Sequence, residues 1–111
     1  MPFITIRTNA VSKDAYLADD VAKMVAELLH KPLVYVVVQV SDACKMSFDG
    51  RFENKGALIE AKSIGFADKA LLAQKLTDFV VERLDVEKRL VNIEFVNMVA
   101  SDVAIAGTLL G

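Results

Sequence analysis

The chain has 111 residues, of which 54% are hydrophobic and 25% charged, and its formal net charge is −2, so its length suits one domain over residues 1–111. The slightly acidic balance has no basic stripe and no apolar run near the ~18 residues of a spanning helix, so we expect neither a nucleic-acid partner nor a membrane. The single cysteine excludes an internal disulfide, and the N-terminus lacks a signal-peptide pattern, which predicts a cytoplasmic protein and leaves signal-independent secretion open.

The first third of the chain predicts a strand followed by a helix. Residues 3–9 alternate in polarity, as a half-buried strand does. A polar break follows, in which Ser12 is the expected helix cap. Apolar residues then recur at helical spacing, namely Leu17, Val21, Met24, Val25 and Leu28. The helix ends at His30-Lys31-Pro32, because the residue before a proline avoids helical angles.

The middle of the chain predicts a strand, a loop and another strand. Residues 33–40 are almost uniformly apolar, which is typical of a strand buried on both faces. Residues 41–56 are mostly small and polar and predict a long structured loop. Residues 57–63 then predict the third strand.

The last part of the chain repeats the pattern. A turn at 64–66 leads into a second helix, which carries apolar residues at helical spacing, namely Leu72, Leu76, Phe79 and Val80. Residues 90–96 predict the fourth strand, and residues 102–111 form a small apolar tail.

This order gives two β-α-β units, an α/β (α+β) class. Each crossover is long enough to join parallel strands through a covering helix. The sequence therefore predicts a four-stranded mixed sheet with both helices on one face. We expect the uncovered face to be apolar and to drive oligomerisation.

Pro2, directly after Met1, is the first candidate catalytic residue. Removal of Met1 would leave a secondary amine on a rigid ring, with an ordinary pKa of roughly 7.7–8. Burial or a nearby cation lowers the pKa of such an amine further. An amine poised near neutral pH can act as a general base on carbon beside a carbonyl. A proline at the second position is also common in proteins with no such chemistry.

Several short motifs, in order along the whole chain, resemble the macrophage migration inhibitory factor family of the tautomerase superfamily. No single motif is strong, but their order and spacing together are. They are Pro2 with its strand, Lys31-Pro32 followed by Tyr35, Met46 to Gly50, Ser63-Ile64-Gly65, Val91 to Phe95 and Gly107 to Leu110.

The resemblance implies a cofactor-free homotrimer with sites at subunit interfaces, and no metal. It implies that Pro2 acts as general base and acid on an α-keto acid such as phenylpyruvate. Lys31 would pair with the substrate carboxylate and lower the pKa of Pro2. The backbone N–H of Ile64 would donate to the same carboxylate. Outside this resemblance, Lys31 is more simply a helix-terminal cation and Ile64 a core residue.

The remaining predicted substrate-binding positions depart from the family pattern. Asn92 stands where the family usually has a tyrosine contributed to a neighbouring site, and Glu94 where some members have asparagine. Ile105 and Leu110 replace aromatic residues. The predicted pocket is therefore aliphatic, and we expect weak activity on aromatic keto acids or a different substrate.

Two alternatives stay open. One keeps the fold and the N-terminal proline but has the chain hydrate, dehalogenate or decarboxylate a small acid. The other is a trimeric signalling or binding protein of the same family that has no catalytic activity.

Overall fold

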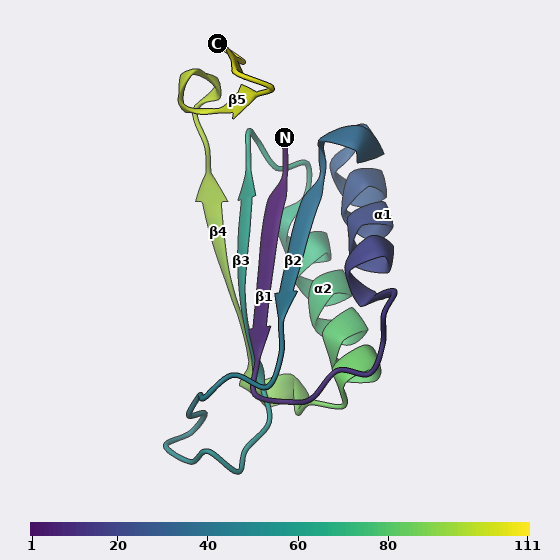
Figure 1. Ribbon diagram of the computed structural model, residues 1–111, viewed down its shortest axis with the longest axis vertical. Helices are drawn as coiled ribbons and strands as arrows, with labels where there is room; N and C mark the ends of the chain where they lie inside the picture. The colour runs from purple at the N-terminus through teal and green to yellow at the C-terminus, as the bar shows by residue number, and fades with distance from the viewer.

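The computed structural model describes residues 1–111 and contains a four-stranded sheet in the order β2-β1-β3-β4 (Figure 1). The strands are β1 (Phe3–Thr8), β2 (Val37–Ser41), β3 (Ala57–Ser63) and β4 (Val91–Asn97). β1 pairs parallel with β2 and antiparallel with β3, and β3 pairs parallel with β4. The predicted mixed sheet is confirmed.

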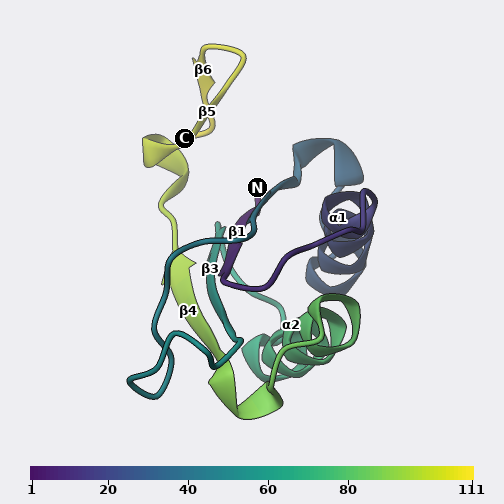
Figure 2. The same cartoon turned by 60° about the horizontal axis from the view of Figure 1, so that its bottom comes forward.

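Two helices, α1 (Leu17–Leu29) and α2 (Lys69–Leu84), cover one face of this sheet (Figure 2). Both helices place an apolar stripe against the alternate strand residues that face them. The resulting core has 15 buried residues, among them Ile4, Ile6, Val21, Val25, Ile59, Leu72, Leu76 and Val80. Neither helix is long and apolar enough to cross a bilayer.

The two ends of α1 differ in how well the sequence predicted them. The expected cap, Ser12, is wrong: the helix starts at Leu17, and the Ser12 hydroxyl accepts a hydrogen bond from the Asp14 N–H in the preceding turn. The C-terminal end is as expected. His30 has a left-handed backbone with φ of 55°, and the Lys31 N–H donates to the Ala26 carbonyl at 3.0 Å.

The apolar run 33–40 is not one strand buried on both faces. It begins with a single 3-10 turn at Leu33–Tyr35, and β2 starts only at Val37. Within β2 the burial alternates, because Val38 packs on the core whereas Val37 is 55% exposed on the other face. β2 is an edge strand, and α1 covers only one of its faces.

The uncovered face of the sheet is not the apolar surface that we expected. Its residues follow from the register and form rows across the strands, of which the central row is entirely polar. That row contains Gln39, Thr5, Glu60 and Glu94, and the flanking rows add Arg7, Lys62, Ser41 and Asn92 to a few apolar side chains. Of the large exposed apolar side chains, Val37 and Leu58 lie on this face, whereas others lie in the segment 33–35 before β2 and in the C-terminal segment.

The chain ends in a two-stranded hairpin, β5 (Ala104–Ile105) with β6 (Thr108–Leu109), preceded by a 3-10 turn at Ala100–Asp102. This hairpin projects beyond the end of the sheet, next to the N-terminus (Figures 1 and 2). The loop between β2 and β3 projects from the opposite end. A 3-10 turn at Lys88–Leu90 leads into β4.

Gly56 closes the long loop against Leu90, in the turn before β4, and leaves no room for a side chain. A Cβ atom there would lie 2.5 Å from the Leu90 carbonyl oxygen and 2.9 Å from the Phe48 ring. We expect Gly56→Ala to lower the free energy of unfolding by about 2–3 kcal/mol, measured by urea denaturation at one protein concentration. Gly50→Ala is the control, because Gly50 has open space and a φ of +74°, and its cost should be about 1 kcal/mol. Equal losses would refute the steric explanation.

Candidate functional site

Pro2 lies fully buried at the start of β1. Its carbonyl oxygen accepts a hydrogen bond from the Val37 N–H at 3.0 Å, which ties it to β2. On the other side, Phe3 pairs with Lys62 of β3. Continuing that antiparallel register places Pro2 across from Ser63, and Met1 across from Ile64. The N-terminus therefore lies beside the turn that follows β3.

The structure brings Lys31 and Ile64 together at this end of the sheet. The Lys31 ammonium nitrogen donates to the Ile64 carbonyl oxygen at 3.3 Å, across 33 positions of sequence. The left-handed residue His30 ends α1 and turns the chain so that Lys31 leaves the helix at this point. Lys31 is half-buried, and its positive charge is held close to the N-terminus.

Hydrogen bonds to the C-terminal end of β4 and to the residue after it fix the turn that follows β3. The Met98 N–H donates to the Ser63 carbonyl at 2.8 Å, and the Gly65 N–H donates to the Asn97 side chain at 2.9 Å. Gly65 has a φ of +80°, a conformation that favours glycine. Among the hydrogen bonds outside the regular ladders, none uses the N–H of Ile64. This N–H is a donor available to a ligand.

The electrostatics of this end favour a neutral amine. Burial lowers the pKa of the Met1 amino group below its ordinary value, and the positive charge of Lys31 lowers it further. Both effects disfavour the protonated form. An amine at this place is therefore a free base at a lower pH than an amine in water.

A cavity of about 350 Å³ opens at the N-terminus. It is lined by Met1, Tyr35, Ile105, Thr108 and Leu110, so the C-terminal hairpin supplies most of its wall. Ile105 was a predicted site residue. Tyr35 and Thr108 were not, although Tyr35 could have been found as the aromatic residue nearest in sequence to Lys31.

Asn92 and Glu94 do not lie with Pro2 within the chain. Both are exposed on the uncovered face of the sheet, where Asn92 pairs with Leu58 and Glu94 with Glu60. Asn92 is four residues along β4 from the level of Phe3, or about 13 Å at 3.3 Å per residue. Any role of these two residues in a site with Pro2 requires a second chain.

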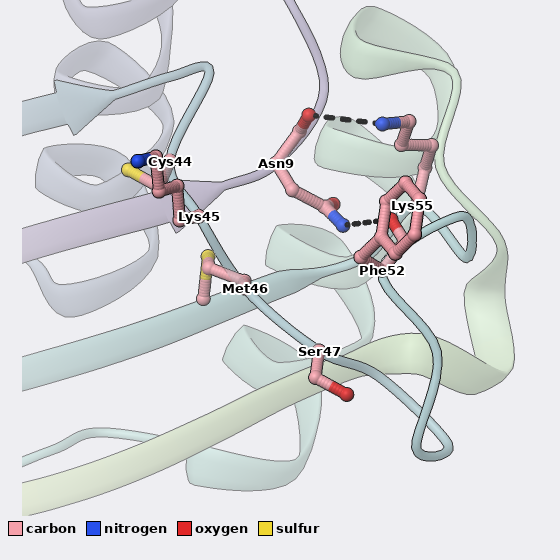
Figure 3. A pocket seen from close by; sticks show the side chains of 7 residues that line it. All are labelled: Asn9, Cys44, Lys45, Met46, Ser47, Phe52 and Lys55. Carbon is pink, nitrogen blue, oxygen red and sulfur yellow. Dashed lines mark hydrogen bonds between the residues drawn. The ribbon is translucent and has the colours of Figure 1, made fainter.

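A larger cavity, of about 530 Å³, lies at the opposite end of the sheet (Figure 3). Its polar groups hold the long loop: the Asn9 amide donates to the Asn54 carbonyl at 2.7 Å, and Lys55 donates to the Asn9 carbonyl at 3.4 Å. The Cys44 thiol in its wall donates to the Ser41 carbonyl at 3.3 Å. These groups have structural partners, which makes the N-terminal cavity the better candidate site.

Comparisons with known proteins agree on one family. The model of the macrophage migration inhibitory factor family matches residues 1–111. A macrophage migration inhibitory factor homolog of Brugia malayi is 33% identical over 116 residues, covering 100% of both chains. The solved structure of the Trichinella spiralis factor has a TM-score of 0.89 at 28% identity, over 96% of this chain and 98% of that one. The structure of the factor from Oncomelania hupensis, at 22% identity, supports the fold with a TM-score of 0.93, over 100% of this chain and 83% of that one.

Proposed function

The chain belongs to the macrophage migration inhibitory factor family, and on this premise we propose that it is a cofactor-free keto–enol tautomerase of small α-keto acids. One observation carries the proposal: the N-terminus lies beside a fixed positive charge, Lys31, and beside the free N–H of Ile64. A positive charge and an N–H donor are the partners that a substrate carboxylate needs. A proton transfer from the carbon next to the keto group also needs a base. Removal of Met1 supplies that base as the amine of Pro2.

The chemistry follows from these three groups. In the ketone-to-enol direction the neutral Pro2 nitrogen takes a proton from the carbon beside the keto group. The electrons of the broken C–H bond form the C=C bond, and the keto oxygen becomes an enolate that takes the proton back. Lys31 and the Ile64 N–H bind the substrate carboxylate and hold that carbon against the nitrogen.

The substrate would take the place that Met1 occupies. The register of β1, extended to the N-terminus, places Met1 opposite Ile64, and Met1 lines the cavity. Its removal uncovers the Pro2 nitrogen and enlarges the cavity in one step. The expectation that Met1 is removed is part of this proposal.

We further propose that the active form is a homotrimer in the cytoplasm. In the single chain, Val34 is 81% exposed and Leu109 is 61% exposed. Assembly of the trimer would bury these side chains, and the other exposed apolar side chains of the segment 33–37 and of the C-terminal hairpin, between subunits. In such an assembly Asn92 and Glu94 of one chain would reach the site of its neighbour, which they cannot do within their own chain.

A second candidate function is binding without catalysis. The hairpin wall of the cavity favours it, because Ile105 and Leu110 provide no ring to stack on an aromatic substrate and leave Tyr35 as the single ring in the lining. An assembled trimer that turns over none of a panel of aromatic and aliphatic keto acids would support this alternative. A hydratase, dehalogenase or decarboxylase activity would appear with a second panel of unsaturated, halogenated and β-keto acids, as the hydrated acid, halide or carbon dioxide.

The direct test is Pro2→Gly in protein whose mass shows that Met1 is absent. Glycine keeps an N-terminal amine but loses the rigid ring, so we expect the ketonisation of phenylpyruvate enol or of an aliphatic enol to slow about 10- to 100-fold. The control is Thr5→Ser on the uncovered face of β1, which should keep the full rate. An unchanged rate in Pro2→Gly would remove proline as the base.

A further inference from the structure

We propose that the hydroxyl of Ser63 positions the Pro2 nitrogen by accepting a hydrogen bond from its N–H once Met1 has been removed. The proposal deepens the function proposed above and rests on it for the catalytic role of the amine. Ser63 touches no substrate in this proposal. It acts through Pro2.

The first observation is that Ser63 is buried without a partner. Its exposed fraction is 0%, and its hydroxyl oxygen makes no hydrogen bond. It is the one side-chain oxygen or nitrogen in the protein that is buried in this way. Buried hydroxyls almost always have a partner, because leaving one unpaired destabilises the folded state. The unpaired hydroxyl therefore points to a partner that this covalent form of the chain does not offer.

The second observation is where the hydroxyl lies. The register of β1 and β3, extended by one residue beyond the pair of Phe3 and Lys62, places Ser63 across from Pro2, and both side chains are buried on the face that the helices cover. In the chain with Met1 attached, the Pro2 nitrogen is an amide that carries no hydrogen. Cleavage of Met1 turns it into an amine with an N–H. Cleavage thus creates a hydrogen-bond donor, the Pro2 N–H, near the Ser63 hydroxyl, which has no other partner.

The consequence for catalysis is the orientation of the lone pair. A neutral secondary amine has one N–H and one lone pair. If the N–H points to Ser63, the lone pair is left for the cavity lined by Tyr35 and Ile105, where the substrate carbon must approach.

The hydrogen bond also has a predictable effect on the amine pKa. It is stronger when the donor is the charged ammonium, so Ser63 raises the pKa of Pro2. Lys31, from the end of α1, lowers it. The other ionisable group in the cavity is Tyr35, while Glu60 and Lys62 of β3 lie on the opposite face of the sheet. Ser63 and Lys31 therefore have opposite effects on the pKa of the Pro2 amine.

The test measures the Pro2 amine pKa directly, by NMR titration of ¹⁵N-proline-labelled protein without Met1. We expect Ser63→Ala to lower that pKa by about one unit and to slow turnover about tenfold. Ser63→Thr, which keeps a hydroxyl, should restore both values. If threonine does not fit, Ser63→Cys is nearly the same size but a weak acceptor, and should resemble Ser63→Ala. An unchanged pKa in Ser63→Ala would overturn the proposal.

A second arm needs no activity. Protein that retains Met1 has no N–H for Ser63, so Ser63→Ala should leave its melting temperature unchanged or raise it. In protein without Met1 the same substitution should lower the melting temperature. Equal shifts in both forms would overturn the proposal. Wild-type protein without turnover would refute the tautomerase function, yet the titration and the melting temperatures would still decide the role of Ser63.

Discussion

Protein that retains Met1 should show no tautomerase rate above buffer, a loss of at least about 100-fold relative to the processed form. Two causes act together. The Pro2 nitrogen is then an amide without a basic lone pair, and Met1, attached to that nitrogen, lines the cavity beside Tyr35 and Ile105 and narrows the space for a substrate. The measurement is the ketonisation rate of fractions whose N-terminus is established by intact mass.

The matched control for Met1 is the same sample after treatment with a methionine aminopeptidase. Removal of the residue should restore the full rate in proportion to the fraction cleaved. Equal activity before and after cleavage would show that the Pro2 amine is not the base. A rate that falls on cleavage would instead direct attention to the Met1 amino group, whose pKa is lowered by burial and by Lys31.

The order of the elements could be predicted because periodicity reports local structure. The spacing of Val21 and Val25, and of Leu72 and Leu76, follows the helix repeat, and all four side chains are fully buried. The end of α1 at His30 was predicted and is confirmed for a similar reason. Pro32 disfavours helical backbone angles at Lys31, so the helix ends at the residue before it.

The surroundings of the sheet could not be predicted from the same patterns. A run of valines is compatible with burial on both faces or on one, and only the tertiary arrangement decides. β2 is an edge strand, so Val37 lies open in the single chain. The polar central row on the uncovered face needs the register of four strands, which no single segment contains.

The candidate site, like the sheet, could be predicted from the sequence only in part. Pro2 was a candidate from its own chemistry, whereas Lys31 and Ile64 came from a family resemblance, and the structure shows the contact between Lys31 and Ile64. Ser63 was part of a motif, but no sequence pattern indicated that its hydroxyl is buried without a hydrogen-bond partner. Its significance comes from its burial and from the strand opposite. The hairpin wall was only partly predicted, because Thr108 is polar and lies in a tail without clear periodicity.

Replacing Lys31 with glutamine should produce two separable effects at the proposed site. Loss of the ammonium should raise KM for an α-keto acid about 10- to 100-fold, as expected for a hydrogen-bonded charge. Loss of the same charge removes a cause that lowers the pKa of the N-terminal amine, so the pKa rises. Because the base must be neutral, the acidic limb of the kcat/KM profile should move to higher pH.

The methyl ester of the substrate separates the two effects of Lys31→Gln, because it has no carboxylate to pair. With the ester, the pH limb should still move while KM stays nearly constant. Lys31→Arg keeps the charge and should leave the limb in place. Lys23→Gln removes an exposed charge from α1, the helix that precedes Lys31, and should change neither quantity. A KM that rises equally for the acid and the ester would show that Lys31 shapes the cavity and does not bind the carboxylate.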